Sequence, residues 1–153
     1  MLSYAILIDG GFAKRKLGTA KTHATANEFQ KLISTLKSHP QLADLHLHRV
    51  YYYDSIPLAS AHEKPLGGGK VEFANQPIAT RSRQLFEQLW KLPLVALRLG
   101  ELTFNGWAVD KKILEKSAAE SVEIKHSDLK PQISQKGVDI SAPIPQHGCF
   151  SLF

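Results

Sequence analysis

The pattern of hydrophobic and polar residues begins with a short apolar run that ends in a carboxylate. Ala5 to Ile8 are all apolar, and Asp9 is followed by the glycine pair Gly10-Gly11. An apolar run of this length, bounded by glycines, is typical of a buried β-strand. The glycines allow the backbone to turn sharply directly after the strand. We therefore expect Asp9 at the carboxyl edge of a parallel sheet, where α/β proteins bind their ligands.

Two later stretches have apolar residues at the spacing of an α-helix. Residues 25–28 (Thr-Ala-Asn-Glu) match a capping box, which begins a helix that should run to about Lys37. A second helix is expected from Thr80 to Leu92. The side chains predicted to face inward on this second helix are Leu85, Phe86, Leu89 and Trp90.

Three other segments have the pattern of β-structure. Leu45 to Asp54 alternates and also ends in an aspartate, with Leu47 expected on one face and Val50 and Tyr52 on the other. Its two histidines, at 46 and 48, have no third ligand nearby in sequence, which favours partly exposed or hydrogen-bonded histidines over a metal site there. A third strand is expected at 94–99, a turn at Gly100, a hairpin at 102–109 around the Asn105-Gly106 pair, and a minor strand at 122–124.

Residues 56–77 contain no clear period, and their prolines and glycines predict a long loop. Gly67-Gly68-Gly69-Lys70 resembles a phosphate-binding loop only superficially. Lys64 stands where the first glycine of GxxxxGK[ST] is required, and Val71 replaces the Ser or Thr that would bind magnesium. The triple glycine is therefore predicted to form a flexible loop tip.

Composition narrows the class of protein without identifying it. A chain of 153 residues with 43% hydrophobic and 22% charged residues is expected to form one globular domain. The net charge of +5 is consistent with a polyanionic partner such as a nucleic acid. A single cysteine, the absence of an apolar run of membrane-spanning length and the lack of a signal-peptide pattern predict a cytoplasmic protein without a membrane partner.

The sequence lacks residues that several classes of enzyme require. A haloacid-dehalogenase-type phosphotransferase needs a second aspartate two residues after the first, and Gly11 stands there. The first strand is not followed by the GxGxxG of a dinucleotide-binding fold. No GxSxG occurs, and Cys149 lies in an irregular segment, so a serine or cysteine hydrolase is disfavoured.

Four segments together resemble a known family: AILIDGGFAKRKL, RVYYYDS, LPLVALRLGELTFNGW and QKGVDI, in this order. This combination is similar to the NYN-domain proteins, which belong to the PIN-like group of metal-dependent ribonucleases. The resemblance implies an α/β fold, a three-layer sandwich in which helices flank a mainly parallel central sheet. It also implies hydrolysis of phosphodiester bonds in RNA, with single-stranded RNA as the expected substrate.

The resemblance also implies which residues form the site. Asp9 and Asp139 correspond to acids that would bind Mg²⁺ or Mn²⁺, and Asp54 corresponds to a further catalytic acid at a strand end. The residues expected to contact the RNA backbone are Lys14, Arg15, Lys16 and Lys136.

The sequence departs from the family after residue 140. Family members continue with a helix and a strand that ends in an SGDSDF-like acidic motif, whereas here Pro143 and Pro145 interrupt any helix. We therefore expect an incomplete domain at 1–140, with C-terminal strands missing as in a truncated reading frame, and an irregular tail at 141–153. Nuclease activity should then be weak or absent. The alternative is a non-catalytic RNA-binding or protein-interaction module that retains the fold.

Overall fold

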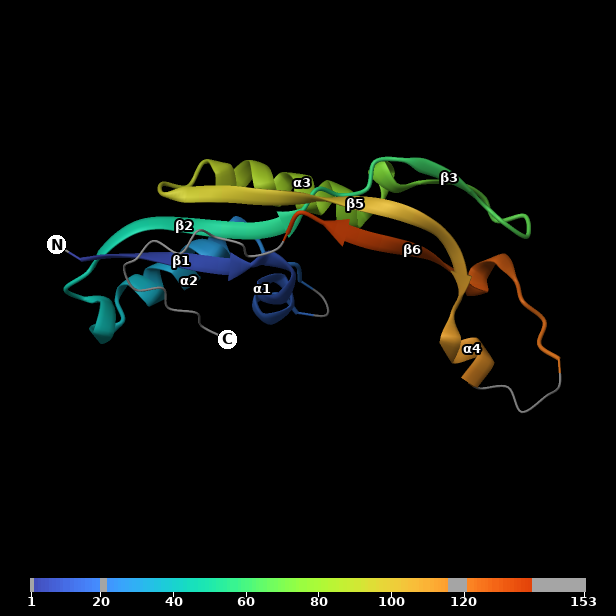
Figure 1. The fold of residues 1–153 in the computed structure, drawn as a ribbon, viewed down its shortest axis with the longest axis horizontal. Helices are drawn as coiled ribbons and strands as arrows, with labels where there is room; N and C mark the ends of the chain where they lie inside the picture. Colours follow the sequence, from blue (N-terminus) through green and yellow to red (C-terminus); the bar gives the residue numbers. More distant parts are fainter. Residues whose placement is uncertain (1, 20–21, 116–120, 139–153) are drawn as a thin grey trace.

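The structure is a computed structural model that describes residues 2–19, 22–115 and 121–138 (Figure 1). Asp139 and the expected tail at 141–153 lie outside the described residues, so the structure tests neither of them. Within the described ranges, no helix is both long and apolar enough to cross a membrane.

The main sheet has four strands in the order β1-β2-β5-β6. The pairings β1–β2 and β2–β5 are parallel, and β5–β6 is antiparallel. A separate antiparallel pair is formed by β3 and β4. The strands are β1 (Ser3–Asp9), β2 (His46–Ser55), β3 (Ala61–Lys64), β4 (Gly69–Glu72), β5 (Val95–Val109) and β6 (Leu129–Lys136).

The expectation of a mainly parallel sheet is wrong, because β5 does not end where the sequence suggested. The strand continues through Gly100 and through the Asn105-Gly106 pair, which forms an irregularity between Phe104 and Trp107 instead of a hairpin turn. Gly106 has a φ of +108°, a conformation that favours glycine. Pairing with β6 therefore outweighs the local turn signal, and the fold is α/β with a mixed sheet.

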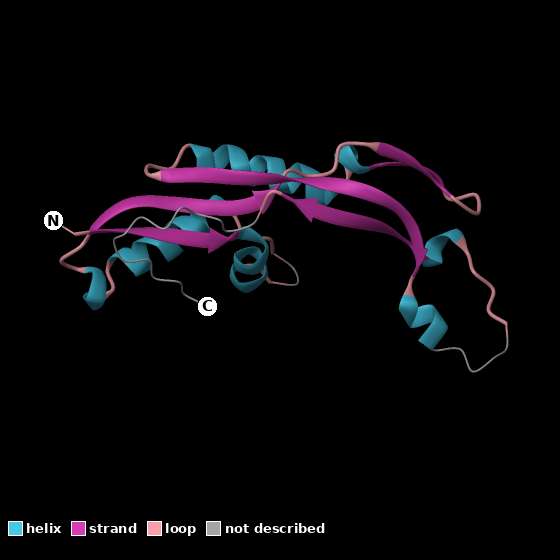
Figure 2. Ribbon diagram, in the orientation of Figure 1, coloured by secondary structure: helices cyan, strands magenta, loops and turns pink. Residues whose placement is uncertain are grey.

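Helices occupy the segments between the strands (Figure 2). The capping box of α2 is confirmed, since the Glu28 carboxylate accepts a hydrogen bond from the Thr25 backbone N–H at 2.7 Å. The helix α3 begins earlier than predicted, because Pro77 is well suited to the first turn. The helices are α1 (Gly10–Leu17), α2 (Ala26–Lys37), α3 (Pro77–Trp90) and α4 (Lys111–Glu115), with 3₁₀ turns η1 (Pro40–Leu42), η2 (Phe73–Asn75) and η3 (His126–Asp128).

The hydrophobic core lies between one face of the sheet and the helices α2 and α3. The ring of Tyr52 contacts Phe29 of α2 at 5.3 Å and Phe86 of α3 at 6.2 Å between centroids, so both helices cover the same face. Leu85 and Leu89 are buried as predicted. Trp90 is 71% exposed, which contradicts its predicted inward orientation. It follows Leu89 by about 100° around the helix and so points away from the sheet.

A bulge in β2 changes which side chains lie on each face of the strand, so the predicted distribution is wrong. The register shifts so that Tyr4 pairs with Leu47 and Ala5 with Arg49, which leaves one residue of β2 unpaired. As a result Leu47 joins Val50 in the core instead of facing the opposite side. The two nearby histidines, His46 and His48, are both exposed.

The region predicted as a long loop contains the β3–β4 hairpin. An aromatic cluster attaches this hairpin to the far half of β5: the His62 ring stacks on Phe104 at 3.8 Å, and Phe73 lies 5.7 Å from Phe104. The indole N–H of Trp107 donates to the Glu63 carbonyl at 2.9 Å. The strands are short and polar, so no alternation of apolar and polar residues revealed them.

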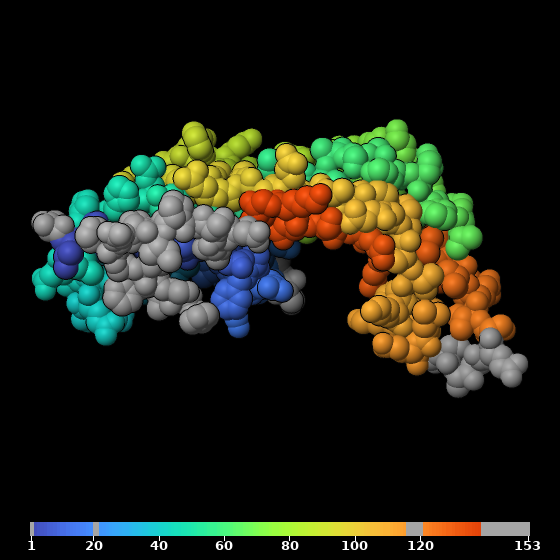
Figure 3. All heavy atoms as spheres, viewed as in Figure 1, coloured from blue at the N-terminus to red at the C-terminus, as the bar shows by residue number. Residues whose placement is uncertain are grey.

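The far end of β5 and the helix α4 extend beyond the part of the molecule that contains α1, α2 and α3 (Figures 1 and 3).

The segment after β5 begins with a short helix. Lys111 and Lys112 are the first residues of this helix, α4. The minor strand predicted at 122–124 is wrong, because these residues have no regular structure.

The core assignment predicts contrasting effects of two aromatic substitutions. Phe29→Ala removes a fully buried ring and should lower the free energy of unfolding by about 3–5 kcal/mol. Trp90→Ala should change it by less than about 0.5 kcal/mol, because the indole is largely exposed. Urea denaturation monitored by circular dichroism measures both values. Equal destabilisation by the two substitutions would contradict the assignment.

Candidate active site

Two acidic residues lie at the carboxyl edge of the parallel strands. Asp9 is the last residue of β1, and its direct partner in β2 is Tyr53. Asp54 therefore lies one residue further along the neighbouring strand. This register places Asp9 at the carboxyl edge of the parallel strands, as expected from the sequence, with Asp54 on the neighbouring strand.

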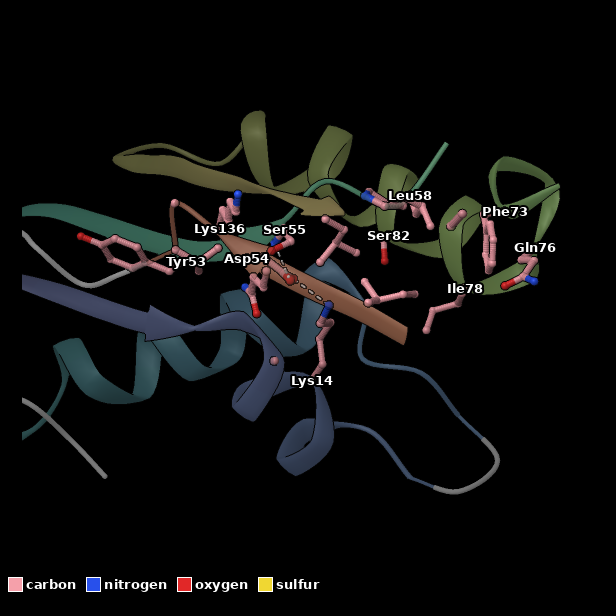
Figure 4. A pocket seen from close by; sticks show the side chains of 18 of the residues that line it. Lys14, Tyr53, Asp54, Ser55, Leu58, Phe73, Gln76, Ile78, Ser82 and Lys136 are labelled. Atoms are coloured by element: carbon pink, nitrogen blue, oxygen red, sulfur yellow. Dashed lines mark hydrogen bonds and ion pairs between the residues drawn. The ribbon is translucent and has the colours of Figure 1, made fainter. Parts of the chain in front are cut away.

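A pocket of about 800 Å³ opens at this edge (Figure 4). Four of the predicted site residues line it together: Asp9, Lys14, Asp54 and Lys136.

The other predicted site residues do not join them in the described structure. Arg15 and Lys16 are exposed on α1 and do not line the pocket. The Lys16 ammonium instead lies 5.5 Å from the ring centroid of Phe12. Asp139 is outside the described residues.

Asp9 begins the helix α1. Its Oδ1 accepts a hydrogen bond from the Phe12 backbone N–H at 2.9 Å, which makes Asp9 the N-cap of the helix. Gly10 and Gly11 are the first two helical residues, so the chain passes from strand to helix without the expected intervening turn. The hydrogen bond from Phe12 orients the Asp9 carboxylate, and Asp9 lines the pocket.

Asp54 is held by three donors. Its Oδ1 accepts from the Ser55 backbone N–H at 2.8 Å. Its Oδ2 accepts from the Tyr52 hydroxyl at 2.8 Å and lies 2.6 Å from the Lys14 ammonium. The Asp54 side chain is only 11% exposed, so this ion pair is shielded from water on the carboxylate side. The carboxylate is thus fixed in position and its charge is balanced.

Tyr52 connects Asp54 with the core. Burial raises the pKa of the Tyr52 phenol, and the negative charge of Asp54, the hydrogen bond to it and the charge of Asp9 raise this pKa further. The phenol therefore remains a protonated donor at neutral pH. Gly10 is required beside it, because a Cβ there would lie 2.5 Å from the Tyr52 hydroxyl oxygen and 2.8 Å from Asp54 Oδ2.

Ser55 is a pocket residue that the sequence analysis did not identify. It is 8% exposed, and its Oγ is the buried side-chain polar atom that has no hydrogen-bond partner in the described part of the chain. An unsatisfied buried hydroxyl costs about 1–3 kcal/mol, which is unusual for a residue kept only for packing. The available signal was its place directly after a strand-end acid.

The described residues offer a limited set of metal ligands. They contain no group of three or more His, Cys, Asp or Glu side chains arranged around one point. Asp9 and Asp54 nevertheless suit Mg²⁺ or Mn²⁺, because Mg²⁺ commonly uses one or two carboxylates and keeps several waters. The Lys14 ammonium competes for Asp54 in such a site.

No family model matches this chain, and no curated protein or solved structure shows a significant similarity to it. The resemblance to NYN-domain proteins therefore depends on the sequence motifs alone.

The contact between Tyr52 and Asp54 predicts a pH-dependent effect of Tyr52→Phe. At neutral pH the variant should lose about 1–3 kcal/mol of unfolding free energy, since a hydrogen bond to a charged group is removed. Above about pH 10 the phenol ionises in the unfolded wild-type chain but remains protonated in the folded one. The wild type then loses stability with rising pH, by up to about 1.4 kcal/mol per pH unit from this group, and the variant does not.

Urea denaturation between about pH 8 and about pH 11 measures this effect. The difference between wild type and Tyr52→Phe should shrink as the pH rises. A difference that stays constant over this range would contradict the proposed environment of Tyr52.

Proposed function

We propose that this chain is a metal-dependent nuclease of the NYN and PIN-like type that hydrolyses phosphodiester bonds in single-stranded RNA. The observation that carries the proposal is the pocket at the carboxyl edge of the parallel strands, which is lined by Asp9, Asp54, Lys14 and Lys136. Carboxylates suit a hard divalent cation, and lysines suit the phosphates of the substrate. The net charge of +5 and the single cysteine agree with an RNA partner in the cytoplasm.

Each residue has a distinct role in this proposal. Asp9 and Asp54, together with Asp139, would hold Mg²⁺ or Mn²⁺. Such an ion, when bound, lowers the pKa of a coordinated water and neutralises charge on the leaving oxygen. Lys136 would neutralise a phosphate of the RNA strand. Lys14 balances Asp54 in the free protein and is close enough to the pocket to turn to a phosphate when RNA binds.

The proposed metal site predicts a loss of cation binding in Asp9→Asn. Calorimetric titration of the wild-type chain with Mn²⁺ should show weak binding, because few carboxylates are available. Asp9→Asn should weaken Mn²⁺ binding by about tenfold or more. Even the loss of a residue that only hydrogen-bonds to a metal ligand typically weakens metal affinity by this much. Asp44→Asn, which changes an exposed aspartate outside the pocket, is the matched control and should bind as the wild type does.

Cleavage of an unpaired RNA oligonucleotide in Mg²⁺ completes this test. Slow cleavage that Asp9→Asn abolishes and Asp44→Asn retains would support the nuclease. Mn²⁺ binding that is unaffected by Asp9→Asn would contradict the proposed site.

A specific contact favours the second candidate, a non-catalytic RNA-binding module. The Lys14 ammonium lies 2.6 Å from Asp54 Oδ2 and already supplies the positive charge that a metal ion would bring. A chain that retains this fold but not the chemistry would bind RNA through Lys14 and Lys136 without a divalent cation. RNA binding in the absence of any measurable Mn²⁺ binding would favour this candidate over the nuclease.

Competition between the lysine and the cation predicts opposite effects of Lys14→Met on two ligands. Mn²⁺ should bind severalfold more tightly, because Asp54 no longer has an internal cation. Single-stranded RNA should bind more weakly, and the slope of log affinity against log salt should fall by about 0.7, the value for one phosphate contact on a single strand.

Lys16→Met is the matched control for this substitution. Lys16 has the same charge on the same helix but does not line the pocket. Its removal should leave Mn²⁺ binding unchanged. Weaker Mn²⁺ binding in Lys14→Met than in the wild type would show that the two cations do not compete for Asp54.

A further inference from the structure

The pocket has two chemically different ends (Figure 4). Lys14, Asp54 and Lys136 lie toward one end, and Phe73 and Ile78 lie toward the other. The charged end contains the proposed catalytic acids. Phosphodiester chemistry does not account for the apolar side chains at the opposite end.

Two large apolar side chains of the pocket are exposed to solvent. Ile78, in the first turn of α3, is 65% exposed, and Ile133, in β6, is 43% exposed. They come from segments far apart in the sequence and line one cavity. Neither is needed to fill the core. Exposed apolar side chains that converge in a pocket typically contact a ligand.

The strand β6 connects the apolar end with the charged end. Every second residue of this strand lines the pocket, namely Pro131, Ile133 and Gln135. Lys136, the next residue, also lines it. The distance from Pro131 to Gln135 along a strand is about 13 Å. A ligand that contacts Ile133 can therefore extend along β6 to the cationic end.

Two polar side chains near the apolar end can form hydrogen bonds with a ligand. Gln76 immediately precedes α3, and its side chain makes no capping hydrogen bond to the helix. Its amide offers two donors and a carbonyl acceptor. The Ser82 hydroxyl lines the same region of the pocket (Figure 4). A flat apolar group with donors and acceptors on its edge matches this combination of surfaces.

We propose that the apolar end binds one unpaired nucleobase of the RNA strand whose phosphate lies at Lys14 and Lys136. The inference rests on the proposed function in that it takes RNA as the ligand. The base packs between Ile78 and Ile133, and its edge reaches the Gln76 amide. A base in a duplex is stacked and paired, so this site selects unpaired RNA. The lysines at the charged end of the pocket favour a base that belongs to a phosphate-bearing strand over an uncharged apolar ligand.

Fluorescence anisotropy with a labelled single-stranded RNA of about ten nucleotides tests the base site. The measurement is made in EDTA, so that the RNA is not cleaved. Ile78→Ala should weaken binding by about tenfold, the scale of one base contact. Ile78 is largely exposed and alanine favours helices, so the variant should fold. Ile124→Ala changes an isoleucine outside the pocket and is the matched control, with no expected effect.

A series of RNAs that each lack one base adds a direct measure of coupling. Loss of the base at one position should weaken wild-type binding to the same extent as Ile78→Ala, and combining both changes should cause no further loss. The salt dependence should remain that of the wild type in Ile78→Ala, because no charge changes.

The possible results separate this inference from the proposed function. If the wild-type chain binds no single-stranded RNA in EDTA, the base site is overturned, and cleavage in Mg²⁺ still decides the proposed function. If it binds RNA but Ile78→Ala binds as well as Ile124→Ala, the base site is overturned and the proposed function stands. Equal affinity for duplex and single-stranded RNA would also overturn the base site.

Discussion

The hydroxyl of Tyr52 lies at the boundary between the hydrophobic core and the charged edge of the sheet. The ring packs against Phe29 and Phe86, so two helices and the sheet determine its position. Its hydroxyl donates to Asp54, and Gly10 lies so close to it that no side chain fits there. The core therefore positions Asp54. The same ring also requires glycine at position 10, where the chain passes from β1 to α1. The placement of Asp9, Lys14 and Asp54 in one pocket depends on this contact.

The long strand β5 adds the second half of the pocket. Its first part pairs with β2 in the parallel section, and its second part pairs with β6 in the antiparallel section. The residues that β6 contributes, Ile133 and Lys136 among them, line the same pocket as the acids because of this extension. The mixed sheet thus provides both the carboxylate edge and a wall along which a polymeric ligand can extend.

Much of the helical and parallel part was predictable from sequence because the signals were local. The capping box at Thr25 and the apolar run before Asp9 define α2 and β1 directly. The bulge in β2 and the continuation of β5 through Asn105-Gly106 were not predictable in this way. Both are set by pairing with distant strands, and the local alternation at Leu47 and the turn signal at Gly106 are overridden.

The candidate site was predictable to a similar degree. Asp9 and Asp54 could be found because each lies at or next to the end of a predicted strand, and parallel pairing brings such ends together. Ser55 and Ile78 were missed, because a buried unpaired hydroxyl and an exposed isoleucine are recognised only in three dimensions. Lys14 was expected to contact RNA, but its ion pair with Asp54 could not be inferred from a helix that the sequence had not revealed.

Paramagnetic broadening by Mn²⁺ in an amide NMR spectrum tests most directly whether the two acids form one cation site. Substoichiometric Mn²⁺ should broaden first the backbone N–H signals of Gly10, Gly11 and Ser55, which adjoin Asp9 and Asp54. Signals of the exposed His46 and His48 should remain sharp at the same concentration. Broadening that begins at those histidines, or that shows no preference for the carboxyl edge of the sheet, would contradict the account.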